Sequence, residues 1–195
     1  HLASAQHMGK VQCVWMDPTQ DPPLLAYAGN AHGGLWRTTD GGSTWSNITD
    51  GHPYPILGVY SILRLTDQAP ARLIIGTGGG SYDDYGCGVF TSDDDGVTWY
   101  RSPGIDASAG GTIVDLRHYG NQVYAVQGTH VWRSANRGLT FTEITPGVSP
   151  VPFGDEPDDS NRYTGIGKYL AGGGQGLLVL AAKDETQVGD GPDIY

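Results

Sequence analysis

Two segments combine side chains that are suited to binding sugars or cations. In SYDDYG, residues 81–86, tyrosine rings could stack on a sugar while the carboxylates between them accept its hydroxyl hydrogens. In GDEPDDSN, residues 154–161, closely spaced acids could bind Ca²⁺, although the spacing and glycine of an EF-hand are missing and a solvated acidic loop is the simpler interpretation. The candidate binding residues are Tyr82, Asp83, Asp84, Tyr85, Asp155, Glu156, Asp158 and Asp159.

Other recognisable chemistry is missing from the sequence. There is no catalytic triad, phosphate loop or zinc motif, and GTGGGS at 76–81 lacks the lysine that follows a phosphate-cradling loop. Arg64 and Arg117 fall late on predicted strands, away from the expected pocket, so they do not form an arginine cluster that could hold a substrate carboxylate. We therefore expect no catalytic residue among these positions and no cofactor, with Ca²⁺ at the acidic loops as the one candidate ligand ion.

The charge balance excludes one class of partner. The chain of 195 residues has 21 acidic and 11 basic side chains, a formal net charge of −10, which argues against nucleic acid. The sequence has no run of 18 apolar residues, so it predicts no transmembrane segment. Cys13 and Cys87 do not have the spacing of metal ligands. The sequence allows two interpretations, either two buried thiols or a disulfide between them.

The elements that position these residues are predicted to be strands. With 31 glycines, 12 prolines and only 38% apolar residues, the chain is rich in turns. Short runs such as LLAYAG, RLIIG and QVYAVQG have strand composition, and no long window keeps a helical apolar period. The predicted fold class is all-β.

An eight-residue pattern occurs three times, as TTDGGSTW, SDDDGVTW and SANRGLTF. Its aromatic residues stand at 45, 99 and 141, at intervals of 54 and 42 residues. Each copy lies between the third and fourth of four short predicted strands, and repeats of this size predict the blades of a β-propeller. The shared positions are Thr38, Asp40, Gly42, Thr44 and Trp45; Ser92, Asp94, Gly96, Thr98 and Trp99; and Ser134, Asn136, Gly138, Thr140 and Phe141.

The repeated pattern has a structural explanation. Its glycine can take positive φ in a tight turn, its Asp or Asn side chain can accept backbone N–H bonds, and its aromatic ring can fold back as an apolar plug. Asn136 keeps the acceptor but lacks the charge, which a catalytic carboxylate could not readily do. We expect all three copies to be structural.

The pattern resembles the Asp-box, or BNR, repeat of sialidase-like and sortilin-like β-propellers, and the resemblance covers nearly the whole chain. Stretches such as GNAHGGLWRTTDGGSTWSNITDG and PILGVYSI also resemble secreted bacterial propellers exported by type IX secretion. This resemblance implies a secreted or cell-surface protein, although no sorting domain is present.

The predicted propeller is incomplete, with about three and a half blades. It spans 8–195 after a lead-in of residues 1–7, and its fourth unit stops before a motif of its own, so we expect further blades in a longer protein. The predicted blades are 8–50, 56–103, 110–146 and an incomplete 160–195.

One end of this propeller is expected to be acidic and functional. The links between blades and the turns between second and third strands share that end, and they contain Asp50, the two acidic segments and few cations. We expect a non-catalytic recognition or scaffold module that binds glycan or protein there. The alternatives are a peptide-gripping sortilin-like propeller, or a sialidase-like or xyloglucanase-like glycoside hydrolase whose catalytic residues lie largely outside these residues.

Overall fold

The protein is described here by a computed structural model. It covers residues 10–54, 56, 58–67, 69–78, 86–105, 111–127 and 130–144, and the backbone of 162–170 and 176–183. Within these ranges, no helix is long and apolar enough to cross a membrane.

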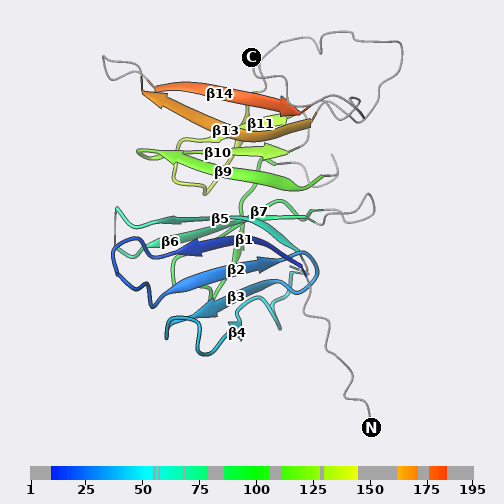
Figure 1. The fold of residues 1–195 in the computed structure, drawn as a ribbon. Helices are drawn as coiled ribbons and strands as arrows, with labels where there is room; N and C mark the ends of the chain where they lie inside the picture. Colours follow the sequence, from blue (N-terminus) through cyan, green and yellow to red (C-terminus); the bar gives the residue numbers. More distant parts are fainter. Residues whose placement is uncertain are drawn as a thin grey trace, which may run out of the picture.

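Three four-stranded antiparallel sheets follow one another along the chain, and a two-stranded sheet comes last (Figure 1). Each four-stranded sheet has its strands in sequence order, so the predicted all-β propeller fold is confirmed. Sheet 1 contains β1 (Val11–Met16), β2 (Ala26–Asn30), β3 (Leu35–Thr38) and β4 (Ser46–Asn47). Sheet 2 contains β5 (Val59–Leu65), β6 (Arg72–Thr77), β7 (Val89–Ser92) and β8 (Tyr100–Arg101). Sheet 3 contains β9 (Ile113–Tyr119), β10 (Gln122–Gln127), β11 (His130–Ser134) and β12 (Thr142–Glu143), and sheet 4 contains β13 (Arg162–Leu170) and β14 (Gly176–Lys183).

The cores lie between neighbouring sheets. In β6, Ile75 belongs to the core shared with sheet 1, and its neighbour Ile74 belongs to the core shared with sheet 3. Successive residues of a strand point to opposite faces, so a middle sheet needs apolar residues on both. This requirement explains the unbroken apolar run in β6, where a slip of one residue would exchange the two cores.

The sheets have two distinct ends. Strand β1 lies against β5, and β5 lies against β9. Arg37, near the end of β3, contacts the second hairpin at Asp95, and Arg72, at the start of β6, contacts the third at Arg137, so the hairpin-bearing ends of the sheets lie together. We call one end the hairpin end, because it contains the motif hairpins at 39–45, 93–99 and 135–141. The opposite end, with the β2–β3 turn at 31–34 and the link after β4 at 48–58, is called the loop end.

Candidate functional site

The second motif shows how its side chains hold the hairpin. Ser92, at the end of β7, accepts the N–H of Gly96 at 2.8 Å and donates its own hydroxyl to Asp94 Oδ1 at 2.8 Å. Asp94 in turn accepts the backbone N–H of Thr98 at 2.8 Å and its hydroxyl at 2.6 Å. The first motif repeats this arrangement with Thr38, Asp40, Gly42 and Thr44.

The third motif reaches the same geometry with a neutral side chain. Asn136 Oδ1 accepts the N–H of Thr140 at 2.9 Å, as the aspartates do. Its amide nitrogen then donates to the Thr140 hydroxyl at 2.8 Å, which reverses the direction of that bond. Because a hydroxyl can donate or accept, the turn keeps both contacts without a charge.

The two motif aspartates are unsuited to acid catalysis. Hydrogen bonds from Thr44, first from its side chain and then from its backbone, lower the pKa of Asp40 from 3.8 to about 2. Burial acts to raise the pKa of Asp94, but hydrogen bonds from Thr98 and Ser92 outweigh it, and the net pKa is lowered. Carboxylates that stay ionised and bonded within their own hairpin cannot supply a proton near neutral pH.

The sequence interpretation missed one role within the motif. We expected the Asp or Asn to accept the backbone N–H bonds of the turn, yet the buried glycine N–H is accepted by the hydroxyl at the first motif position, Ser92 in the second copy. The Asp94 partner Thr98 is exposed. Removing the hydroxyl therefore leaves a buried donor unpaired, whereas removing the carboxylate does not.

The motif places two consecutive residues at positive φ. Gly42, Gly96 and Gly138 have φ of 90°, 91° and 85°. The preceding residue is Gly41 in the first copy but Asp95 and Arg137 in the others, with φ of 54° and 60°. A non-glycine residue in this region carries a backbone cost, which the contacts of Asp95 and Arg137 must offset.

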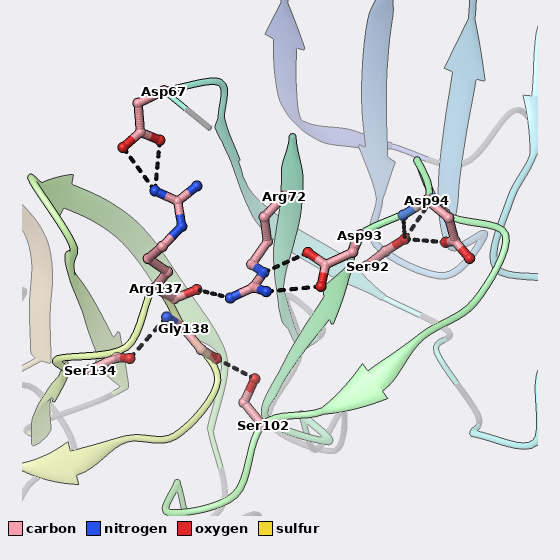
Figure 2. A network of polar contacts seen from close by, with 10 residues as sticks. Asp67, Arg72, Ser92, Asp93, Asp94, Ser102, Ser134, Arg137 and Gly138 are labelled. Atoms are coloured by element: carbon pink, nitrogen blue, oxygen red, sulfur yellow. Dashed lines mark hydrogen bonds and ion pairs between the residues drawn. The ribbon is translucent and has the colours of Figure 1, made fainter. Parts of the chain in front are cut away.

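Arg137 joins sheets 2 and 3 at the hairpin end. Its guanidinium donates to both oxygens of Asp67 at 2.8 Å, which lowers the pKa of that carboxyl. Its carbonyl accepts a hydrogen bond from Arg72 at 3.2 Å, and Arg72 also makes a bidentate pair with Asp93 at 2.7 and 2.8 Å (Figure 2). Ser102 adds a 2.6 Å hydrogen bond to the carbonyl of Gly138.

Asp95 joins sheets 1 and 2 in the same way. Its carbonyl accepts from Arg37 at 3.0 Å, and its carboxylate accepts from Arg64 at 3.0 Å and from the Tyr27 hydroxyl at 3.1 Å. Burial raises the pKa of Tyr27 to about 12, and the charge of Asp95 acts in the same direction, so the phenol stays a donor. Arg64 also lies 5.5 Å from the ring centre of Trp15.

A cavity of about 380 Å³ opens at the hairpin end beside Arg72, Arg137 and Asn136. Its charged groups are already engaged, because Arg72 pairs with Asp93 and Arg137 pairs with Asp67. Binding a charged ligand there would require breaking contacts that hold the sheets together. We therefore assign this end a structural role.

The motif aromatics differ in their burial. The Trp99 ring is 5% exposed, and its indole N–H donates to the carbonyl of Ile48 in sheet 1 at 3.0 Å. Phe141 is also 5% exposed, and its N–H donates to Pro103 in sheet 2. Trp45 is 41% exposed, so it does not serve as the apolar plug that the sequence led us to expect. No described sheet lies against that side of sheet 1.

Asparagines shape the described part of the loop end. Asn30 accepts the N–H of His32 at 2.9 Å, and Asn47 accepts the N–H of Thr49 at 2.8 Å while donating to Gly33 at 2.9 Å. These bonds fix the β2–β3 turn against the link that follows β4.

The candidate binding residues Tyr82, Asp83, Asp84, Tyr85, Asp155, Glu156, Asp158 and Asp159 lie outside the described residues.

The described residues offer no metal site and no reactive thiolate. No group of three or more His, Cys, Asp or Glu residues there could hold a metal ion, and the Ca²⁺ prediction falls on residues outside it. Cys13 and Cys87 do not form a disulfide. Burial raises the pKa of Cys13 to about 12 against a smaller lowering by the Gly29 backbone, so this thiol stays protonated at neutral pH.

Two curated proteins with xyloglucanase names are similar in sequence. A probable oligoxyloglucan-reducing end-specific xyloglucanase from Neosartorya fischeri is 33% identical over 152 residues, which cover 76% of this chain and 17% of that protein. A xyloglucanase from Hypocrea jecorina is 27% identical over 158 residues, which cover 71% of this chain and 18% of that protein. The chain thus spans less than one fifth of the length of these relatives.

Solved structures show where this fold occurs. An ancestral GH74 enzyme matches with a TM-score of 0.60 at 20% identity, over 89% of this chain and 22% of that one. The GH74 enzyme of Niastella koreensis matches with a TM-score of 0.51 at 19% identity, over 70% of this chain and 21% of that one. No protein-family model matches the chain. At these identities the structures establish a shared fold, that of part of a GH74 propeller.

The comparisons correct the function expected from sequence. Both curated relatives have names of xyloglucan-hydrolysing enzymes, and the two structures described above are GH74 enzymes. The expectation of a non-catalytic recognition or scaffold module is therefore wrong, and the glycoside hydrolase alternative is favoured. The comparisons also give no support to the resemblance to type IX exported propellers. What the chain is similar to, in sequence and in fold, is part of a xyloglucanase propeller.

Proposed function

We propose that this chain is part of a β-propeller glycoside hydrolase that acts on xyloglucan. The observation that carries the proposal is the 33% identity to the Neosartorya fischeri protein over 76% of the chain. The GH74-like arrangement of its four-stranded sheets supports the same conclusion. The sialidase-like alternative has no comparable support, because neither curated relative above has a sialidase name.

The described residues supply the scaffold in this proposal. Glycoside hydrolysis generally needs two carboxyl groups, one of which can donate a proton to the leaving oxygen. At the hairpin end, Asp40 and Asp94 are bonded within their own hairpins, and Asp67, Asp93 and Asp95 are paired with arginines. We therefore do not assign the catalytic pair to these five aspartates.

The loop end is the proposed glycan face. The hairpin-end carboxylates named above are already bonded, whereas the sequence segments 81–86 and 154–161, which we expect at the loop end, combine aromatic and acidic residues suited to sugar rings and hydroxyls. Stacking by Tyr82 and Tyr85, with hydroxyl contacts from Asp83 and Asp84, is proposed for one subsite. A polymeric substrate of this kind also supports an extracellular location.

Hydrolysis by the natural, full-length protein tests this function. The expected result is release of oligosaccharides from xyloglucan, with no release of sialic acid from sialyllactose. The variant Asp94→Asn serves as a folded control that should keep the activity, because Asn136 already occupies the equivalent place. Binding of xyloglucan without any hydrolysis, or hydrolysis of the sialylated substrate alone, would contradict the proposal.

A further inference from the structure

Tyr54, in the link that follows β4 at the loop end, holds an aromatic ring at the surface. Its ring centre lies 5.3 Å from that of Phe90, and the two ring planes are inclined at 59°. Phe90 is fully buried in the core between sheets 1 and 2, whereas Tyr54 is 39% exposed. A core residue thus supports one part of the Tyr54 ring, and the rest stays open to a ligand. A ring presented in this way is suited to stacking against the apolar face of a sugar.

Arg101 reaches the same place from the outermost strand of sheet 2. Strand register pairs it with Phe90, so the two side chains lie on the same face of the sheet. Its Nε donates to the carbonyl of Cys87 at 2.9 Å, and the N–H of Cys87 donates to the hydroxyl of the buried Thr77 at 2.7 Å. These bonds give the guanidinium a fixed position at the loop end.

Most of the donor capacity of Arg101 remains available to a ligand. A guanidinium has five N–H groups, and the bond to Cys87 uses one of them. The side chain is exposed. Arg64, Arg72 and Arg137 are each paired with a carboxylate, but within the described ranges no carboxylate pairs with Arg101.

The equivalent position in the other two sheets shows what the fold itself requires there. Asn47 is the counterpart of Arg101 in sheet 1, because each pairs with the same position of the third strand. Its amide nitrogen donates to the carbonyl of Gly33, which occupies the place of Cys87. Glu143, the counterpart in sheet 3, also bonds to a residue at the start of the third strand of its own sheet. The fold thus needs one bond back across the sheet, and the additional N–H groups of Arg101 have no structural counterpart.

We propose that Tyr54 and Arg101 form a subsite for a neutral sugar residue of a xyloglucan chain. The Tyr54 ring stacks against the C–H groups of the sugar, and the N–H groups of Arg101 donate to its hydroxyl oxygens. The formal net charge of −10 disfavours an anionic ligand, and the Arg101 cation disfavours a cationic one. The inference rests on the hydrolase function proposed above. The subsite adjoins Cys87, which directly follows the candidate segment 81–86 in the sequence.

Calorimetric titration of the natural, full-length protein with a xyloglucan oligosaccharide that it does not cleave tests the subsite. Tyr54→Ala should weaken binding about tenfold because the stacking surface is lost, whereas Tyr54→Phe keeps the ring and should stay within about threefold of the unmodified protein. Tyr100→Ala is the matched control. Tyr100 is 63% exposed and precedes Arg101 in β8, but successive residues of a strand point to opposite faces, so its removal should leave the affinity unchanged.

Arg101→Gln separates the sugar contact from the structural bond. A glutamine amide can still donate to the Cys87 carbonyl, as Asn47 does to Gly33, so the melting temperature should stay unchanged. The affinity for the oligosaccharide should fall about fivefold, because the N–H groups that face the sugar are lost. This variant keeps the test decisive even if Tyr54→Ala fails to fold.

The outcomes distinguish the subsite from the function on which it rests. Unchanged affinity in Arg101→Gln, or equal losses in Tyr54→Ala and Tyr100→Ala, would overturn the subsite alone, provided that the unmodified protein binds and hydrolyses xyloglucan. An unmodified protein that neither binds nor hydrolyses xyloglucan would overturn the proposed function, and the subsite with it.

Discussion

The motif hydroxyl offers the sharpest test of how the hairpins are held. Ser92 is fully buried, and its oxygen accepts the N–H of the buried Gly96 at 2.8 Å. The change Ser92→Ala removes this acceptor at a site that solvent does not reach. It also removes the hydroxyl donated to Asp94, but that carboxylate is exposed and can bind water instead.

The magnitude follows from the unpaired donor. A buried N–H without a partner costs about 1–3 kcal/mol, so we expect Ser92→Ala to lower the free energy of unfolding by about 2 kcal/mol. For a chain of this size that loss corresponds to a fall in melting temperature of about 4–8 °C. The bond from the hydroxyl to the exposed carboxylate adds little to this sum.

Urea unfolding of the variants measures this loss. The control is Ser43→Ala, in the first hairpin, where an exposed hydroxyl donates to the Asp40 carbonyl at 3.1 Å. Removing that hydroxyl should change stability by less than about 0.5 kcal/mol. Ser134→Ala should repeat the larger loss, because Ser134 accepts the buried N–H of Gly138 at 2.8 Å. Equal losses in Ser92→Ala and Ser43→Ala would refute the reasoning.

Three further predictions concern the same hairpins. Asp94→Asn should leave the melting temperature nearly unchanged, whereas Asp94→Ala should cost about 1 kcal/mol in urea unfolding, since it removes the acceptor of an exposed N–H; equal effects would contradict this. Trp99→Ala should cost about 3–5 kcal/mol and Trp99→Phe clearly less, because Phe141 fills the equivalent position; calorimetry that ranks them equally would contradict the packing role. The folded-state pKa of Asp40 is about 2, below its ordinary 3.8, so its stabilising contribution is complete above pH 3.8 and is lost as the pH falls toward 2. Melting curves at falling pH should therefore show a smaller acid loss in Asp40→Asn, and an unchanged loss would contradict the assignment.

Much of the fold could be predicted from the sequence because the motif repeats at blade-sized intervals. The spacing of Trp45, Trp99 and Phe141 placed each hairpin between two strands and implied four strands a unit. Their different burial could not be predicted in this way. Burial depends on what packs against a sheet, and three similar motifs contain no information about the neighbour of the first.

The contacts between sheets could not be predicted from the sequence either. Arg37 is on β3 and Arg72 opens β6, so no shared spacing links them, yet each donates to the carbonyl of a positive-φ residue in the next sheet. The Asp or Asn at the third motif position is polar and repeated, so the sequence predicts it as the acceptor of the N–H groups in the turn. The buried role of Ser92 was missed because a hydroxyl gives a weak pattern in sequence and its burial appears only after folding.

The function expected from sequence was wrong for a related reason. The absence of a recognisable carboxylate pair in the sequence favours a recognition module, although catalytic residues of a propeller can come from several blades. Scaffold blades of an enzyme and blades of a binding module obey the same packing rules. Only comparison with the xyloglucanases separated the two.

Hydrogen–deuterium exchange of the natural protein with and without a xyloglucan oligosaccharide tests most directly whether the loop end binds the glycan. We expect slower exchange at the loop end, in 31–34 and 48–54, where the glycan face is proposed. The hairpins at 39–45 and 93–99 should exchange at unchanged rates, because their polar groups are bonded within the fold. Protection confined to the hairpins, with the loop end unaffected by the oligosaccharide, would contradict the account.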